Sequence, residues 1–363
     1  MRIALVHDHL IQMGGGERVL QALHRMFPEA PIFTLFYHSN LAGSFPNADI
    51  RPSFLQRVLG ALAHYQWFLP LMPLATESYD LRDFDVVISS VSALAKGIIT
   101  RPETVHLCYC HTPTRYLWME SQSYIADLKK PSLVKPFIPL LLSRLRQWDH
   151  TAAQRVDVFI ANSRSVQQRI TKYYRRPSQV IYPPVTVAET DVAKELGEFF
   201  LTGGRLVPYK RFDLTIKAFN RLGLPLKIFG AGPLMKELRS MARPNIEFLG
   251  FVSDVERTEL YERSIAFVHP QEEDFGLTAI ESMASGRPVV ALRRGGAIET
   301  VAPGVSGVFF EDSTWESLYT VMLNTDFSQF HPAAVHAHAL QFDQSVFITA
   351  MRRALDHAYA SRS

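Results

Sequence analysis

The chain contains little cysteine. Only two cysteines, Cys108 and Cys110, occur among 363 residues, and they lie too close in sequence for ordinary disulfide geometry. This low usage indicates a reducing compartment. Because no second cysteine pair could complete a site, a zinc centre built on Cys108-Tyr109-Cys110-His111 is disfavoured.

Long apolar runs and low-complexity tracts are also missing. Residues 1–7 are expected to form a buried strand, not a signal peptide with a charged region and a long apolar core. The most apolar region, 58–75, is interrupted by two prolines, a histidine and a glutamine, which excludes a membrane-spanning helix there. With 47% hydrophobic and 20% charged residues, the composition is that of a soluble globular protein, which we expect in the cytoplasm.

The net charge of +3 is unevenly distributed. Residues 1–183 hold 20 Lys and Arg against 13 Asp and Glu, a charge of +7, which leaves 18 basic and 22 acidic residues, or −4, for the remainder. The basic half is therefore expected to meet any anionic surface. Basic and aromatic residues do not interleave on a recognisable nucleic-acid-binding module, so nucleic acid is not an expected partner.

Apolar strand-like runs alternate with helical patterns along the chain. The expected strands are 3–6, 32–36, 86–89, 106–109, 158–161 and 180–182 in the first half, and 199–202, 227–229, 246–248, 265–268, 289–291 and 308–310 in the second. A helix is expected over 19–27, after Gly14-Gly15-Gly16, and helical patterns in the second half cover 212–221, 234–241, 255–263 and 278–285. Near-continuous apolar strands with helices between them predict an α/β fold whose parallel sheets are covered on both faces.

A break in this pattern divides the chain into two domains. Pro183-Pro184 has a rigid backbone and marks the expected start of a hinge. The expected domains are 1–185 and 186–345, each doubly wound and Rossmann-like. A last helical pattern, 346–363, has Val346, Met351, Leu355 and Ala358 at helical spacing.

Two carboxylates with seven residues between them, Glu273 and Glu281, are the most informative local feature. The first follows the apolar strand 265–268, and the second lies inside the helix that begins after Gly276. Glycine at that point permits close approach of the backbone to a ligand, and the free N–H groups of a helix start bind anions. This arrangement suits a sugar nucleotide, because the amides can hold the diphosphate and the carboxylates can hold hydroxyls.

The segment resembles the E-x7-E signature of family-four retaining glycosyltransferases. Other motifs follow in the family's order: Gly14-Gly15-Gly16, Gly203-Gly204-Arg205 with Lys210, Gly230-Ala231-Gly232-Pro233, Gly295-Gly296 with Glu299-Thr300, and Gly304 to Gly307. The resemblance implies the GT-B fold, with two Rossmann-like domains facing a cleft and a C-terminal helix that packs back on the first domain. It also implies a retaining, metal-independent transferase that uses a nucleotide-diphosphate sugar and no cofactor.

The resemblance also assigns site residues. Catalytic roles are expected for Glu273, His111, Arg205 and Lys210. Donor-binding roles are expected for Gly15, Gly16, Arg205, Lys210, Phe251, Val252, Glu273, Phe275, Gly276, Leu277, Thr278 and Glu281, and Asn162 and Ser163 are candidates for the cleft. Two cations after a strand suit a diphosphate, although Arg211 stands where the family usually has glycine.

Two other functions, nicotinamide binding and metal binding, are disfavoured by the positions of the residues that they would need. The spacing Gly-x-Gly-x-x-Gly of nicotinamide-binding proteins is absent, because position 19 is Val, so a dehydrogenase is disfavoured. The resemblance instead places the amides of Gly14-Gly15-Gly16 against the donor's diphosphate or the acceptor. Asp83-Phe84-Asp85 precedes a strand, at the wrong edge for a metal site in the cleft, and is interpreted as a turn.

Three segments narrow the expected donor. The runs 106–118, 161–164 and 181–185 are similar to bacterial mannosyltransferases of O-antigen and exopolysaccharide assembly, which implies GDP-mannose. UDP-glucose or another UDP-hexose remains the alternative donor. A sugar-nucleotide epimerase, a phosphorylase and a non-catalytic sugar-nucleotide sensor are the alternatives of other classes.

Two stretches of the first half mix basic and apolar residues. They are 53–75, with Arg57 and His64, and 129–146, with Lys129, Lys130 and Lys135. Buried helices with solvated ends would give the same pattern. Together with the +7 charge, the stretches predict peripheral docking on an anionic membrane, at the inner face, with a lipid-linked oligosaccharide as acceptor.

Overall fold

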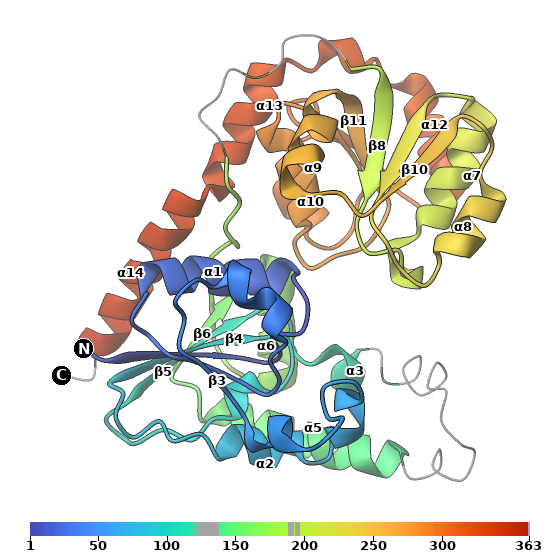
Figure 1. The fold of residues 1–363 in the computed structure, drawn as a ribbon. Coiled ribbons are helices and arrows are strands. Elements are labelled where there is room, and N and C mark those ends of the chain that lie inside the picture. The colour runs from blue at the N-terminus through green and yellow to red at the C-terminus, as the bar shows by residue number, and fades with distance from the viewer. Residues whose placement is uncertain (120, 122–137, 188–191, 193–196, 362–363) are drawn as a thin grey trace. The chain divides into compact units, whose positions relative to one another are not determined.

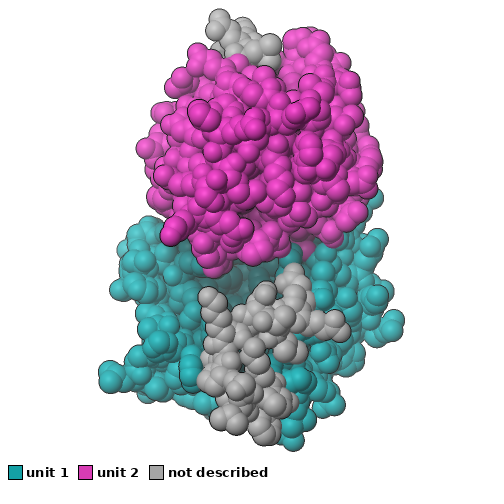
Figure 2. Space-filling model, turned by 90° about the vertical axis from the view of Figure 1, so that its right-hand side faces the viewer, with its two compact units in different colours: residues 1–182, 347–363 teal, residues 183–346 magenta. Residues whose placement is uncertain are grey.

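The computed structural model describes residues 1–119, 121, 138–187, 192 and 197–361. The chain forms two compact units (Figures 1 and 2). Unit 1 contains Met1–Tyr182 and Phe347–Ser363, and unit 2 contains Pro183–Val346. Both units are parallel α/β sandwiches, as the alternation of apolar strands and helices predicts.

Unit 1 is built on a seven-stranded parallel sheet of order β3-β2-β1-β4-β5-β6-β7. Its strands are β1 (Ile3–His7), β2 (Ile32–Thr34), β3 (Ile50–Pro52), β4 (Val86–Val91), β5 (Val105–Cys110), β6 (Val158–Ala161) and β7 (Gln179–Val180). The sequence did not predict β3, whose Arg51 and Pro52 give no apolar run. Proline is tolerated there because β3 is an edge strand.

Helices cover both faces of this sheet. Helices α1 (Gly15–Met26) and α14 (Gln344–Ala360) pack on the face that carries Leu5, Ile88 and Leu107. Helices α5 (Ile138–Gln154) and α6 (Arg164–Tyr174) pack on the opposite face, where both cysteines are buried. Alternate residues of each strand therefore enter different cores.

The apolar face of α14 differs from the expected one. Phe347, Met351 and Leu355 are buried in the first core, whereas Val346 is exposed. Phe347 sits four residues before Met351 and so lies on the same side of the helix, and Val346 is one position off that stripe. The C-terminal helix thus belongs to unit 1 through its buried face.

Unit 2 repeats the plan with a six-stranded sheet of order β10-β9-β8-β11-β12-β13. Its strands are β8 (Phe199–Gly203), β9 (Leu226–Phe229), β10 (Ile246–Gly250), β11 (Ser264–His269), β12 (Val289–Leu292) and β13 (Gly307–Phe310). Its longer helices are α7 (Phe212–Leu222), α8 (Met235–Met241), α9 (Asp254–Glu262), α10 (Leu277–Ala284), α12 (Trp315–Asn324) and α13 (Pro332–Ala339). The core on one face is filled from α7, α8 and α12. Among the described residues, no helix is both long and apolar enough to cross a membrane.

Candidate functional site

Adjacent strands bring the predicted site residues of unit 2 together. Strand β8 pairs with β11, so the loops that leave their carboxyl ends are neighbours. Lys210, on the loop after β8, places its Nζ atom 2.8 Å from Oε1 of Glu273, on the loop after β11. Burial alone would lower the pKa of Lys210, but the Glu273 carboxylate outweighs it and the pKa is raised. The lysine is therefore a fixed positive charge at this edge.

Two arginines, Arg205 and Arg211, flank Lys210 in the loop after β8. Arg205 is exposed. Arg211 adopts a left-handed backbone with φ of 52°, and its guanidinium bonds Asp213 at 3.0 Å and the Ser313 hydroxyl at 3.0 Å. A glycine would adopt this conformation without strain. Arg211 therefore takes the backbone conformation that the family's usual glycine would take, and Asp213 and Ser313 hold its side chain.

Three buried polar atoms near the start of α10 have no hydrogen-bond partner within the described part of the chain. They are Nε2 of His269, Oε1 of Gln271 and Oγ1 of Thr278. Native structures satisfy nearly all such atoms, so a cluster of three indicates a place where a polar ligand supplies the partners. Burial lowers the pKa of His269 to about 4, so its ring is neutral near pH 7.

Gly276 is required where it stands. It caps α10 with φ of +91°, and a Cβ there would come within 3.1 Å of Nε2 of His269. The loop that precedes Gly276 is anchored by Gly296, whose amide donates to the Glu273 carbonyl at 2.8 Å. A Cβ on Gly296 would lie only 2.4 Å from the Cα of Phe275. Gly295 and Gly296, which follow β12, therefore allow the loop after β11 to pack directly against their backbone.

Glu281 lies one helix turn into α10 and is held from α9. Nε of Arg257 is 3.2 Å from its Oε2, and the Tyr261 hydroxyl donates to the same oxygen at 3.1 Å. Phe251 and Val252 lie on the loop between β10 and α9, and the Phe251 ring is 86% exposed. The sequence reasoning found Glu281 and this loop, but it missed Arg257 and Tyr261. Helical spacing alone does not show which residues of α9 face α10.

Three polar side chains of unit 1 meet at the carboxyl edge of its sheet. The register places His7 of β1 opposite Ser90 of β4, and His111 directly follows the neighbouring β5. Nδ1 of His7 lies 3.0 Å from the Ser90 carbonyl oxygen, and the Ser90 hydroxyl lies 2.9 Å from Nε2 of His111. His111, which the sequence predicted, therefore belongs to a buried polar cluster.

The glycine loop borders this cluster. Helix α1 begins at Gly15, not near Val19 as the sequence pattern suggested, so Gly15 and Gly16 form its first turn. Glu17 in that turn places Oε1 3.5 Å from Nε2 of His7. A Cβ on Gly16 would come within 3.4 Å of Nε2 of His111. The absence of a side chain at Gly16 lets the first turn of α1 pack closely on the buried His7 and His111 rings.

Asp8 fixes the loop that follows β4. Its two carboxylate oxygens accept four backbone N–H bonds of 2.6–2.8 Å, from Ser92, Ala93, Leu94 and Ala95. Burial alone would raise the pKa of Asp8, but the neighbouring histidines and these amides lower it. The sequence reasoning missed Asp8, although an acidic residue directly after a buried strand was available as a signal.

A second buried network anchors the loop after His111. The carboxylate of Asp149, on α5, pairs with Lys96 and accepts bonds from the Thr114 hydroxyl at 2.9 Å and the Trp118 indole at 2.7 Å. The side chains of Lys96 and Asp149 are both fully buried. This network ties the short helix α3 (Arg115–Trp118) to α5.

The Asn162 and Ser163 pair follows β6 at the same edge. Both residues are buried. The Ser163 hydroxyl caps α6 by accepting from the Val166 amide at 3.2 Å, and it donates to Oδ1 of Asn162 at 3.0 Å. Helix capping accounts for this serine.

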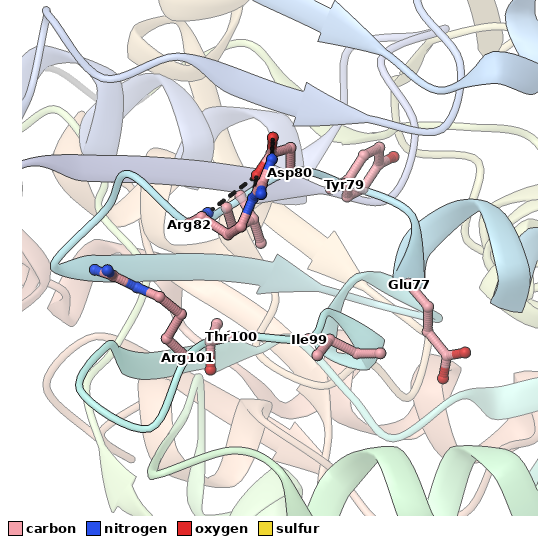
Figure 3. A pocket seen from close by; sticks show the side chains of 8 residues that line it. Glu77, Tyr79, Asp80, Arg82, Ile99, Thr100 and Arg101 are labelled. Carbon is pink, nitrogen blue, oxygen red and sulfur yellow. Dashed lines mark hydrogen bonds and ion pairs between the residues drawn. The ribbon is translucent and has the colours of Figure 1, made fainter.

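A pocket of about 390 Å³ lies elsewhere in unit 1 (Figure 3). Its lining comes from Glu77, Tyr79–Arg82 and Ile99–Arg101, which precede β4 and β5. In the figure, dashed lines join Arg82 to Asp80. Ligands of open α/β sheets bind at the carboxyl ends of strands, and this pocket lies at the amino ends. None of the predicted site residues lines it.

Fold and site together define a class. Two parallel α/β units, each with a polar cluster at the carboxyl edge of its sheet, have the GT-B fold. The solved structure of Anabaena HepE in complex with UDP-glucose has this fold: the TM-score is 0.72, with 20% identity and coverage of 98% of this chain and 100% of that chain.

Sequence comparisons give the family. The model described as "Glycosyltransferase Family 4" matches residues 13–189, and the model described as "Glycosyl transferases group 1" matches residues 189–322. The chain belongs to the family-four glycosyltransferases.

Two curated relatives illustrate the range of similarity. The D-rhamnosyltransferase WbpZ of Pseudomonas aeruginosa is 28% identical over 204 residues, which is 48% of this chain and 52% of that protein. The GDP-mannose-dependent alpha-mannosyltransferase of Corynebacterium glutamicum is 34% identical over 109 residues, 30% of this chain and 26% of that protein. The matches to the first of the curated relatives span about half of their lengths.

Proposed function

We propose that this protein is a retaining hexosyltransferase that takes mannose from GDP-mannose. The observation that carries the proposal is the cluster at the start of α10. There Lys210, the first-turn amides of α10 and three buried polar atoms with no described partner converge. A diphosphate supplies partners for the donors among these groups, because its oxygens accept hydrogen bonds and carry negative charge. Oε1 of Gln271 is an acceptor, so a hydroxyl of the sugar nucleotide is its proposed partner.

The same groups account for catalysis without a metal. The leaving nucleotide gains negative charge as its bond to the sugar breaks, and Lys210 and Arg205 stabilise that charge together with the amides at Gly276–Thr278. The diphosphate competes with Glu273 for Lys210, which releases the Glu273 carboxylate to bind sugar hydroxyls. Glu281, oriented by Arg257 and Tyr261, binds the ribose.

The assignment of guanine as the donor's base and mannose as its sugar rests on the resemblance to mannosyltransferases. The C. glutamicum relative is named as GDP-mannose-dependent, and segments 106–118, 161–164 and 181–185 resemble mannosyltransferases. The HepE complexes contain UDP or UDP-glucose, which keeps UDP-glucose as the alternative. Calorimetric titration with GDP and UDP, followed by product analysis with GDP-mannose, tests the assignment. Tighter binding of UDP would overturn the mannose donor, and activity restored only by Mn²⁺ after chelation would overturn the metal-independent mechanism.

We propose a lipid-linked oligosaccharide on an anionic membrane as the acceptor. Of the predicted docking stretches, 53–75 exposes Leu59, Trp67 and Leu74 beside Arg57, while residues 129–137 of the other lie outside the described residues. Exposed apolar side chains bordered by basic ones suit a lipid interface. Vesicle co-sedimentation at low salt checks this: Trp67→Ser should weaken binding to anionic vesicles, and equal binding of the variant and the wild type would contradict docking through this surface.

A further inference from the structure

The pair formed by His7 and Glu17 is built differently from the other buried ion pair of unit 1. Lys96 and Asp149 are completely enclosed, and Asp149 is saturated by Thr114, Trp118 and Tyr174. His7 is 4% exposed at its side chain, whereas Glu17 is 15% exposed. Glu17 is therefore partly open to solvent at the edge of the sheet where ligands of α/β proteins bind.

Contacts on both ring nitrogens constrain the protonation of His7. Nδ1 lies 3.0 Å from the Ser90 carbonyl oxygen, which can only accept, and 3.2 Å from the Ser90 hydroxyl, so a hydrogen on Nδ1 satisfies the shorter of the two contacts. Nε2 of His7 faces a carboxylate oxygen of Glu17 at 3.5 Å. Either His7 is an imidazolium beside an ionised Glu17, or a neutral His7 accepts from a protonated Glu17.

The ionised pair is the favoured form. Burial alone would lower the pKa of His7, but the hydrogen bond and charge of Glu17 raise it above its usual value. Burial alone would raise the pKa of Glu17, but the same contacts with His7 lower it. Asp8, His9 and His111 are the other titratable groups that act on the pair. A carboxylate held ionised in this way accepts hydrogen bonds and is a weak base.

The surroundings of Glu17 leave room for a ligand. Its second oxygen, Oε2, lies against Gly14, where a Cβ would come within 3.0 Å of it. A Cβ on Gly16 would come within 3.4–3.6 Å of the buried His111 and His7 rings, so the backbone of the glycine loop packs directly on them. Gly14 and Gly16 thus border a partly exposed carboxylate that is backed by two imidazoles and a hydroxyl, and a carboxylate binds the hydroxyls of neutral molecules.

We propose that Glu17 binds a hydroxyl of the acceptor sugar, and that His7 is a positioning residue that keeps this carboxylate charged and oriented. Ser90 links His7 to His111, so the four side chains act as one hydroxyl-binding cluster. This inference rests on the proposed transferase function, because it assigns the acceptor to unit 1.

The test combines binding with kinetics. The probe is mannobiose, observed by saturation-transfer NMR in the absence of nucleotide, and the variant is Glu17→Gln. We expect at least a tenfold weaker mannobiose affinity and a similar rise in acceptor KM, with the Kd for GDP unchanged within twofold. Glu29→Gln removes an exposed carboxylate of the same unit and should leave all three values unchanged.

The pH profile separates positioning from a purely structural role. Because the pKa of His7 is raised, the charged pair is present below that pKa and is lost as the pH increases through it. The mannobiose Kd of the wild type should therefore rise over that range. His7→Asn keeps a donor toward Ser90 but removes the charge, so its affinity should be weaker and flat with pH.

Each outcome decides the inference. If Glu17→Gln keeps wild-type affinity for mannobiose, or loses GDP affinity equally, the inference is wrong even where mannose transfer is observed. If transfer is absent but mannobiose binding depends on Glu17 and on pH as described, the proposed function fails and the hydroxyl site stands. Thermal unfolding of each variant identifies loss of fold.

Discussion

The two units differ in how their polar site groups are partnered. At the edge of unit 1, His7, Glu17, Ser90 and His111 bond to one another. Around the start of α10 in unit 2, three buried polar atoms lack a described partner. The first cluster is already oriented by its own hydrogen bonds. In the second, unpartnered buried atoms cost free energy, and a ligand that bonds them removes that cost.

This difference fits the ligands proposed for each unit. A diphosphate carries strong acceptors and charge, so it can compensate unpaired donors and compete with Glu273 for Lys210. An acceptor sugar is neutral and hydroxylated, so it gains more from groups that are already oriented. Substitutions can distinguish the side chains that stabilise the fold from those that bind the ligand.

The largest effect is expected in the enclosed network of unit 1. Lys96→Met leaves Asp149 as an uncompensated buried charge, which should lower the free energy of unfolding by about 3–5 kcal/mol. Urea unfolding followed by tryptophan fluorescence reports mainly on this unit, because Trp67, Trp118 and Trp148 belong to it. Lys172→Met, at an exposed site, is the control. Equal stability of the two variants would show that the network is not structural.

Lys210→Ala should reduce turnover without unfolding the protein. Removing one group that stabilises charge in the transition state typically costs about 3 kcal/mol, roughly a hundredfold in kcat. The matched control is Lys217→Ala, on the exposed side of α7, which should retain full activity. A kcat within threefold of the wild type would remove Lys210 from the proposed charge-stabilising set.

Gly276→Ala should impair donor binding more than stability. The added Cβ would meet His269 at 3.1 Å and would force a left-handed residue, which costs about 1–2 kcal/mol. Gly223→Ala shares the positive φ, 72°, but has nothing within 4 Å of the new atom. Calorimetry should show about tenfold weaker GDP binding for the first variant only. Identical Kd values for both would mean that the Gly276 turn does not contact the nucleotide.

The smallest effect is expected from Tyr261→Phe. It removes the hydrogen bond of 3.1 Å to Glu281, worth about 1 kcal/mol, while Arg257 still holds the carboxylate. Donor KM should rise about fivefold with kcat nearly unchanged, as measured by initial rates over a range of GDP-mannose concentrations. Tyr319→Phe is the control on α12, and a donor KM that rises equally in both would contradict an orienting role for Tyr261.

Much of the fold could be predicted because buried parallel strands leave continuous apolar runs. All six strands of unit 2 were found from such runs, within two residues at their ends. Strand β3 was missed because Arg51 and Pro52 break the apolar signal at a sheet edge. Helix α1 was expected to begin later, since three glycines give no helical pattern although α1 includes two of them.

The site was predictable only where a motif marks it. Glu273, Lys210 and His111 stand in family motifs, and Glu273 and Lys210 are partners of each other, but Ser90, the partner of His111, stands in none. His269 ends an apolar strand just as His111 follows one, so the same argument could have found it. His7, Glu17 and Ser90 come from three separated segments, and only the register of β1 against β4 brings them together. Which polar atoms remain unpaired depends on side-chain packing, which the sequence does not specify.

Hydrogen exchange in the presence of GDP tests the central claim, that the α10 start of unit 2 binds the diphosphate. The account predicts slower amide exchange in peptides covering 271–284 with GDP, and little change there with guanosine, which has no phosphates. Protection restricted to unit 1, or equal protection by GDP and guanosine at 271–284, would contradict it.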